Sequence, residues 1–177
     1  MKKTDVHARF VTIIKDHKED FYRLAYSYVK NQEDALDIVG DSIKKGLISL
    51  DRIQNPQAIK SWFYKIVVRT SLDFLRKHKR LTVTDDETLN FLSSGQNDQY
   101  ENFDLHEAMN KLPVEYKTVI TLRYFEDLKM EEIAAITDEN ISTVKTRIYR
   151  GLKLLRITLT EENESDERAF KGTEKRI

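Results

Sequence analysis

Two stretches of the sequence concentrate basic side chains. Residues 60–80 contain seven basic residues and one acid, Asp73, and residues 143–156 contain five basic residues and no acid. The whole chain is neutral, with 30 Lys and Arg against 30 Asp and Glu, so the excess is local. Ammonium and guanidinium groups on one surface bind phosphates, and the pattern therefore predicts two nucleic-acid-binding segments.

An acidic segment separates the two basic ones. Residues 81–104 contain six acids and no base, and 81–103 include Ser93-Ser94-Gly95 and Asn97-Asp98-Gln99. This polar composition predicts a flexible linker between two domains. The acids either keep the linker soluble or mimic nucleic acid inside a basic channel.

Residue types that perform catalysis are sparse. There is no cysteine, and His7, His17, His78 and His106 stand at no metal-ligand spacing. Neither a P-loop nor a GxSxG motif is present. The sequence therefore predicts no catalytic residue, no metal, no cofactor and no small-molecule substrate.

Five Gly and two Pro in 177 residues favour an all-α protein. Apolar residues recur at three-and-four spacing over 10–28, which predicts one long helix ending near Lys30. Asn31 can cap a second helix with the stripe Leu36, Val39, Ile43, Leu47 and Leu50. Asn55-Pro56 starts a third helix that reaches the basic cluster 76–80. The expected result is an N-terminal helical bundle domain.

The C-terminal segment has the spacing of a helix-turn-helix. We expect helices from Asp104 to Lys111, from Val114 to about Phe125 and from Lys129 to Ile136. The turn 137–140 then leads into a helix capped by Asn140. Val144, Ile148, Leu152 and Leu155 form its expected buried side. A second helix rich in Thr, Lys and Arg after a short turn is typical of DNA binding.

These motifs resemble a known family. Leu112-Pro113, Thr121 to Leu128, Glu131-Glu132-Ile133-Ala134 and Thr143 to Arg150 resemble domain four of bacterial RNA polymerase sigma factors. Tyr22 to Tyr26, Asp34 to Val39, Trp62 to Ile66 and Asp73 to Arg76 resemble sigma domain two. With only these domains, the chain is similar to the extracytoplasmic-function (ECF) class. The domains would be 1–80, a linker 81–103, 104–160, and a tail 161–177 expected to lack order.

The resemblance implies a non-enzymatic factor that binds core RNA polymerase, recognises two promoter elements and helps open the duplex. The helix from Asp34 to Leu50 would dock on polymerase. Its expected contacts are Asp34, Asp37, Ile38 and Asp41. Acidic faces suit a basic partner, although Asp34 and Asp37 also complement the helix dipole.

The minus-10 element would be read by the loop after this helix and by the third helix, which offer phosphate-binding charge and a base pocket. The expected residues are Arg52, Gln54, Asn55, Lys60, Tyr64, Lys65, Arg69, Arg76, Lys77, Lys79 and Arg80. Trp62 and Phe63 follow the apolar stripe, so Tyr64 is expected to be the exposed aromatic residue.

The minus-35 element would be read by the helix after Asn140. The expected residues are Thr143, Lys145, Thr146, Arg147, Arg150 and Lys153. Arg147 is the first choice for a base contact because Arg bonds guanine O6 and N7 together. Lys145, Arg150 and Lys153 are assigned to phosphates.

Several residues depart from the family pattern. Asp138 and Glu139 replace the usual glycine and apolar residue of the turn, and Lys129 leaves a helix without an evident cap. Gly40 and Gly46 each cost the docking helix about 1 kcal/mol against Ala.

The resemblance further implies a membrane-bound anti-sigma factor and an envelope or extracellular stress signal. No signal-peptide core or membrane span is found in the sequence, so a cytoplasmic location is expected, held near the membrane by that partner. A helix-turn-helix regulator that does not replace sigma, or a helical protein-binding adaptor, are the alternatives.

Overall fold

The computed structural model describes the backbone of residues 3–82 and 100–174, and the side chains of 5–79 and 105–160. The described backbone is helical, with no strand in either range. The α-helices of the N-terminal half are α1 (Lys3–Asp16), α2 (Lys18–Val29), α3 (Gln32–Ser49) and α4 (Ile59–Thr82). Short 3-10 helices, Leu50–Arg52 and Pro56–Ala58, join α3 to α4. The predicted all-α fold class is confirmed.

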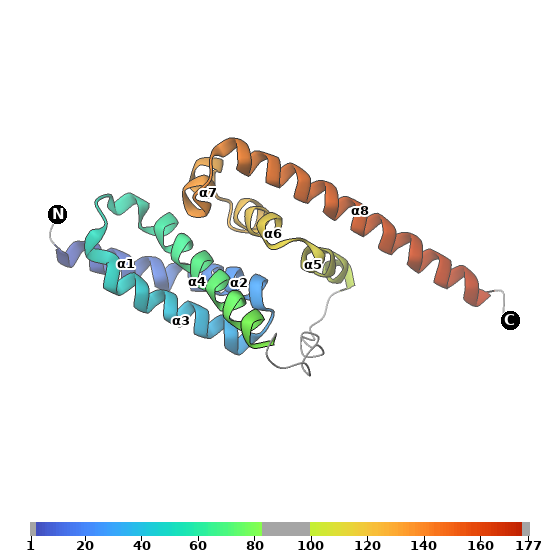
Figure 1. Ribbon diagram of the computed structural model, residues 1–177, viewed down its shortest axis with the longest axis horizontal. Helices are drawn as coiled ribbons and strands as arrows, with labels where there is room; N and C mark the ends of the chain where they lie inside the picture. Colours follow the sequence, from blue (N-terminus) through green and yellow to red (C-terminus); the bar gives the residue numbers. More distant parts are fainter. Residues whose placement is uncertain (1–2, 83–99, 175–177) are drawn as a thin grey trace.

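The C-terminal half comprises α5 (Tyr100–Lys111), α6 (Val114–Ile120), a π-helical turn (Thr121–Phe125), α7 (Met130–Thr137) and α8 (Ile141–Glu174). Figure 1 shows α7 beside α4, while α8 extends along and beyond the other helices of this half. The predicted linker, including its possible mimicry of nucleic acid, falls largely outside the described residues. Its two ends are helical, because α4 continues to Thr82 and α5 begins at Tyr100.

The expected single helix over 10–28 is wrong, because the chain turns at His17 between α1 and α2. The His17 backbone lies at φ −118° and ψ 20°, outside the helical region. The turn allows Phe10 of α1 and Phe21 of α2 to pack edge-on against Phe63 of α4, at centroid distances of 5.3 and 4.7 Å. Periodicity continued across this turn, so the sequence pattern did not reveal it.

The expected helix starts are supported by side-chain caps. Asn31 Oδ1 accepts a hydrogen bond from the Asp34 amide at 3.0 Å, and Asn55 Oδ1 accepts one from the Gln57 amide at 3.0 Å. Asn140 Oδ1 accepts the Thr143 amide at 2.7 Å. The start of α7, for which no cap was expected, is held by Glu132 Oε2, which accepts the Lys129 amide at 2.9 Å. This is the reciprocal half of a capping box.

The two glycines of α3 have different surroundings. A Cβ on Gly46 would stand 2.8 Å from Phe10 Cζ, whereas one on Gly40 would meet nothing within 4 Å. Gly46 therefore allows α1 and α3 to approach closely, and only Gly40 fits the expected simple cost in helix propensity.

The halves share one hydrophobic core. Buried residues of α2, α3 and α4 form a continuous cluster with Val119, Leu122, Leu128, Ile133 and Val144 of the C-terminal half. A smaller cluster lies within the C-terminal half between α5, α6 and α8. Burying apolar surface between the halves stabilises their contact. The bundle and the helix-turn-helix are therefore packed together rather than only tethered.

The C-terminal tail also differs from expectation. Residues 161–174, expected to lack order, continue α8 to Glu174. None of the described helices is long and apolar enough to cross a membrane.

Candidate nucleic-acid and polymerase-binding surfaces

The basic face of α4 follows the sequence prediction at its C-terminal end. Arg76, Lys77 and Lys79 are exposed, and Arg76 Nη1 lies 3.2 Å from Asp73 Oδ1 within the same helix. The Arg80 side chain lies outside the described residues. An exposed ion pair at this spacing is weak, so Arg76 can exchange Asp73 for a phosphate.

The loop before α4 is exposed at each predicted position, Arg52, Gln54 and Asn55. The side-chain oxygen of Asn55, Oδ1, accepts the hydrogen bond that caps the 3-10 helix. Lys60 is half-buried, and its Nζ lies 6.0 Å from the centre of the Tyr64 ring. This distance is at the outer limit for a cation–π contact.

Tyr64 is not an exposed aromatic residue, and that prediction is wrong. Its exposed fraction is 0%, and its hydroxyl donates to Glu126 Oε2 at 2.8 Å. Burial, together with the Glu126 charge, raises the pKa of Tyr64 far above its usual value. The ring packs edge-on against Phe21 at 4.9 Å, so Tyr64 belongs to the core. Trp62, which was expected to pack in the core, is half-buried, and Phe63 is fully buried.

The middle of the α4 face is occupied by the other half of the chain. Lys65 Nζ donates to Asp138 Oδ1, and Arg69 Nη2 donates to Asp138 Oδ2 at 2.6 Å. These hydrogen bonds hold the pKa of Asp138 below its usual value, with Lys65 contributing most. Two predicted minus-10 residues are therefore already bound by the turn of the helix-turn-helix.

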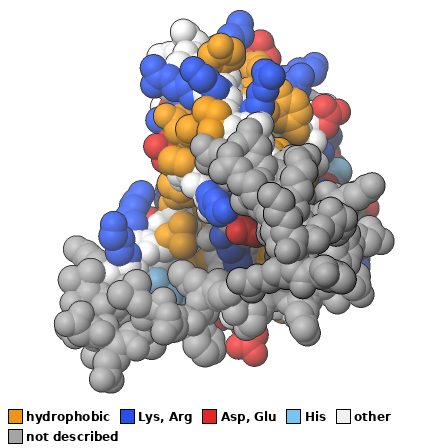
Figure 2. Space-filling view, turned by 90° about the vertical axis from the view of Figure 1, so that its right-hand side faces the viewer, with side chains coloured by type: hydrophobic (Ala, Val, Ile, Leu, Met, Phe, Trp, Pro, Cys, Tyr) orange, Lys and Arg blue, Asp and Glu red, His pale blue; other side chains and the backbone are white. Residues whose placement is uncertain are grey.

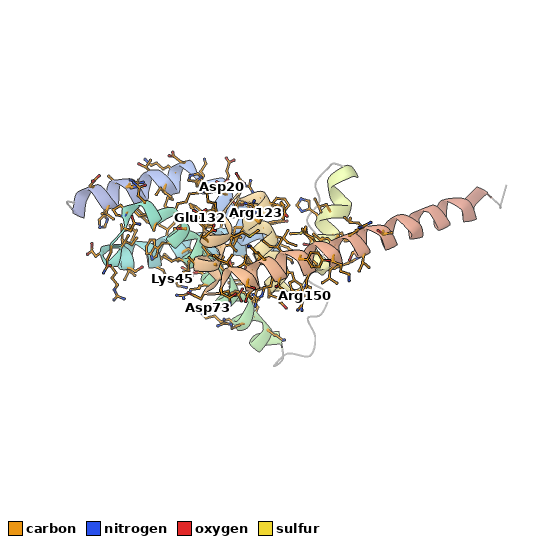
Figure 3. The ribbon with its side chains drawn as sticks, turned by 90° about the horizontal axis from the view of Figure 1, so that it is seen from above. Asp20, Lys45, Asp73, Arg123, Glu132 and Arg150 are labelled. Atoms are coloured by element: carbon orange, nitrogen blue, oxygen red, sulfur yellow. The ribbon has the colours of Figure 1, made fainter. Side chains whose placement is uncertain are left out.

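The start of α8 presents the second basic face. Lys145, Thr146, Arg150 and Lys153 are exposed, and Figure 3 shows Arg150 on the outside of α8. Thr143 is half-buried, and its hydroxyl donates to Asn140 Oδ1 at 2.9 Å. Leu152, expected to be buried, is 39% exposed, whereas Val144, Ile148 and Leu155 are buried as predicted.

Arg147, the first choice for a base contact, makes an ion pair within the same half. Its Nη2 lies 2.5 Å from Glu139 Oε1, and its side chain is 31% exposed. Glu139 Oε2 is buried and has no partner among the described residues. The Arg147 side chain also lines a shallow depression of about 340 Å³, together with Thr143, Thr146 and Arg150.

On α3, the exposure of several apolar side chains differs from the prediction. Asp37 and Asp41 are exposed and Asp34 is half-buried, but Ile38 is 1% exposed. Ile38 thus packs in the core and cannot contact a partner. Leu36 and Leu47, expected to face inward, are 56% and 46% exposed, and Ile48 is 81% exposed. A helix with both acidic and apolar exposed side chains can dock on a protein partner.

Side chains of the N-terminal half surround a buried carboxylate of the C-terminal half. The Glu126 side chain is 0% exposed, and its Oε1 accepts a hydrogen bond from Arg23 Nε at 3.3 Å. Burial is the main cause that raises the pKa of Glu126, although Tyr64 and Arg23 oppose it. Arg23 Nη2 also pairs with Asp20 Oδ1 at 2.9 Å, and Figure 3 labels Asp20. Glu126 stands beside a second acid, Asp127, so its residue type and neighbours gave no signal that it is buried.

The same interface also contains a hydrogen bond, between Tyr28 and Thr118, and a buried ammonium group, that of Lys117. The Tyr28 hydroxyl and Thr118 Oγ1 lie 2.6 Å apart. Burial, and then the charge of Lys30, lower the pKa of Lys117 to about 8. Lys117 is 8% exposed, so its ammonium group is poorly hydrated. The interface thus combines apolar packing with charges that oppose closure.

Figure 2 shows the face seen from the C-terminal side. Lys and Arg side chains there lie around hydrophobic side chains in its upper part. No group of at least three His, Cys, Asp or Glu in the described ranges could hold a metal ion.

Comparisons with known proteins agree with this arrangement. The family model "Sigma-70 region 2" matches residues 13–81, and "Sigma-70, region 4" matches residues 102–155. The two regions include the basic faces of α4 and α8 respectively. The two matched regions together define the class of protein, a sigma-70-type transcription initiation factor.

Relatives place the chain within this class. It is 64% identical over 162 residues to the RNA polymerase sigma factor SigV of Bacillus subtilis (strain 168), covering 92% of this chain and 98% of the relative. It is 29% identical to the ECF RNA polymerase sigma factor SigW of the same strain, covering 91% and 94%. The protein belongs to the ECF family of RNA polymerase sigma factors.

Solved structures share the fold. The sigma factor RpoE, in complex with the anti-sigma factor NepR from Bartonella quintana, matches with a TM-score of 0.74 and 22% identity, covering 88% of this chain and 97% of that one. CnrH, in complex with the cytosolic domain of CnrY, matches with a TM-score of 0.61 and 20% identity, covering 89% and 88%.

Proposed function

We propose that this sigma factor reads promoter DNA with the basic face of α4 at the minus-10 element and the start of α8 at the minus-35 element. The observation that supports this assignment most directly is the presence of a basic helix face in each of the two regions matched by the family models. Residues 1–80 would bind polymerase and the minus-10 element, and 104–160 would read the minus-35 element.

The cations at the start of α8 would have two tasks, phosphate binding and base reading. Lys145, Arg150 and Lys153 are exposed and suit phosphate contacts. Arg147 lies deeper beside Glu139, and the Glu139 carboxylate fixes the direction of its guanidinium. A guanidinium held in place can bond a guanine edge at little further entropic cost, so Arg147 keeps the base-reading role.

In the N-terminal half, the exposed set Arg52, Gln54, Arg76, Lys77 and Lys79 would contact the minus-10 strand first. Tyr64 is excluded from this set by its burial. The polymerase-docking face of α3 would comprise Asp37 and Asp41 with the exposed Leu36 and Leu47, because Ile38 is buried.

Regulation by an anti-sigma factor belongs to the same proposal. One of the two similar solved structures is a sigma factor in complex with an anti-sigma factor. A membrane-bound partner of this kind would hold the chain in the cytoplasm near the membrane until an envelope or extracellular stress signal releases it.

Run-off transcription with bacterial core polymerase on a pool of genomic promoter fragments tests the assignment. Arg150→Ala should lower promoter-specific transcripts about tenfold, since it removes a charge-assisted phosphate contact. Arg147→Ala should instead change which promoters are used, because a bidentate base contact discriminates by about 1–3 kcal/mol.

Arg156→Ala is the matched control, because Arg156 is an exposed arginine of the same helix outside the proposed surface. If all three variants behave alike, α8 does not read the minus-35 element. If the unaltered chain neither binds core nor initiates, the polymerase assignment itself fails.

A further inference from the structure

Ion pairs link α4, which is assigned to the minus-10 element, to the turn that precedes α8, which is assigned to the minus-35 element. Asp138 accepts hydrogen bonds from both Lys65 and Arg69, which lie one helical turn apart on α4. One carboxylate thereby binds two neighbouring cations. This is the arrangement in which a DNA phosphate would bind the same face.

Asp138 has a backbone conformation that is more typical of glycine than of aspartate. Its φ of 58° and ψ of 39° are left-handed, a conformation in which glycine is free of steric cost. The Asp138 amide donates to Ala134 O, and the Glu139 amide does so at 3.0 Å, which ends α7. The turn therefore needs a left-handed residue, but no side chain described in its own half pairs with a carboxylate there.

Among the described residues, the Asp138 carboxylate has its partners in the other half. Lys65 and Arg69 pair with Asp138 across 73 and 69 positions of sequence. The Lys65 side chain is 26% exposed and that of Arg69 is 63% exposed. Both cations can therefore be reached by another anion once Asp138 leaves them.

We propose that Asp138 is an intramolecular competitor of DNA phosphate, which occupies Lys65 and Arg69 while the halves are packed together. Free chain then binds the minus-10 strand with fewer cations than the sequence provides. DNA binding by α4 requires these pairs to exchange. This inference rests on the proposed role of α4 in DNA binding.

A second aspartate in the C-terminal half offers a matched control. Asp127 also has a positive φ, of 50°, and is exposed. Within the described residues it makes no ion pair. Substituting Asp127 changes net charge and turn backbone in the same way as substituting Asp138, but leaves Lys65 and Arg69 paired.

The test measures binding of the full chain, without polymerase, to a fluorescent single-stranded oligonucleotide by anisotropy over a range of salt concentrations. Asp138→Asn removes the charge and keeps the side-chain shape, and Asp138→Gly also suits the positive φ. Circular dichroism checks that each variant is folded.

Freeing Lys65 and Arg69 should tighten binding by roughly threefold to tenfold. The slope of log K against log salt should steepen by about 1.4, because each additional phosphate contact on a single strand adds about 0.7. Asp127→Asn and Asp127→Gly should show only the smaller effect of net charge. The competitor role is overturned if the Asp138 variants bind no more tightly than the Asp127 variants.

A double-mutant cycle identifies the cations involved. Arg69→Ala should weaken oligonucleotide binding several-fold more in the Asp138→Asn background than in the unaltered chain, because Arg69 is free only in the former. Equal losses in both backgrounds would overturn the proposal.

Transcription with core polymerase separates this inference from the proposed function. If the unaltered chain initiates at promoters but Asp138 and Asp127 variants bind DNA alike, only the competitor role fails. If the unaltered chain does not initiate, the proposed function fails, and the competitor role falls with it.

Discussion

The basic faces of α4 and α8 contain the same kinds of side chain, yet they meet different surroundings in the free chain. On α4, Lys65 and Arg69 are bound by an aspartate of the opposite half. On α8, Lys145, Arg150 and Lys153 remain exposed. The difference shows that local charge excess in a sequence identifies a binding face but not whether that face is free.

A buried carboxylate maintains this difference, and its removal should have the largest effect on stability. Glu126→Ala would leave Arg23 and the Tyr64 hydroxyl without their partner and open a void between the halves. We expect a loss of about 2–4 kcal/mol in the free energy of unfolding at pH 7. Urea unfolding followed by circular dichroism measures it.

Glu131→Ala, an exposed acid on α7, is the control for Glu126→Ala and should change stability by less than about 0.5 kcal/mol. Similar losses in both variants would show that Glu126 does not hold the halves together.

Two close-packed glycines, one in each half, test whether the halves unfold together. A Cβ on Gly46 would stand 2.8 Å from Phe10, and one on Gly151 would stand 3.1 Å from Tyr116 Cβ and 2.7 Å from Ile120 Cδ1. Each Gly→Ala change should cost about 1–3 kcal/mol through overpacking. Fluorescence of Trp62, the single tryptophan, reports unfolding of the N-terminal half.

Because the core is shared, Gly151→Ala should lower the urea midpoint of the Trp62 transition as well as that of the circular dichroism. Gly40→Ala, with open space around it, should instead stabilise the chain by up to about 1 kcal/mol. A Trp62 transition unchanged by Gly151→Ala would mean that the halves unfold independently.

The burial of Lys117 at the interface predicts a pH dependence of stability. Burial, and then the charge of Lys30, lower the pKa of Lys117 to about 8 in the folded chain, against 10.5 for an ordinary lysine. Between these values the unfolded chain holds a proton that the folded chain has released, so stability should rise as pH increases from about 8 towards 10.5. Thermal unfolding at pH 7.5 and 9.5 measures the difference.

Lys117→Met removes this titration, so its stability should vary less between the two pH values and exceed that of the unaltered chain at pH 7.5 by roughly 1–2 kcal/mol. Lys153→Met, at an exposed site, should keep the pH dependence of the unaltered chain. Equal pH profiles for the unaltered chain and Lys117→Met would contradict the assignment of the effect to Lys117.

The smallest expected effect concerns Arg147. Glu139→Gln removes the charge that holds its guanidinium, so non-specific duplex binding should tighten by about twofold to threefold while discrimination between promoters declines. Competition binding with two promoter sequences measures both quantities. An unchanged preference would mean that Glu139 does not orient Arg147.

Local signals predicted much of this fold. The caps at Asn31, Asn55 and Asn140 follow from side chains that accept nearby amides, and the helix-turn-helix follows from its spacing. The π-helical turn and the break at His17 did not follow, because apolar periodicity continues through both.

Long-range contacts were the part that the sequence could not predict. Tyr64 was expected to be exposed because its own helix left it off the apolar stripe, but Glu126 lies 62 positions away and supplies its hydrogen-bond partner. Ile38 was assigned to the polymerase-docking surface through the family resemblance, but it is 1% exposed. Asp138 was recognised as an unusual turn residue, yet its pairing with α4 depends on how the halves pack.

The salt dependence of duplex DNA binding by the free chain tests most directly the claim that the α8 face is open while the middle of the α4 face, at Lys65 and Arg69, is covered. Lys145→Met with Arg150→Met should reduce the slope of log K against log salt by about 1.8, since each lost phosphate contact removes about 0.9. Lys65→Met with Arg69→Met should leave that slope nearly unchanged. Equal reductions in both double variants would contradict the account.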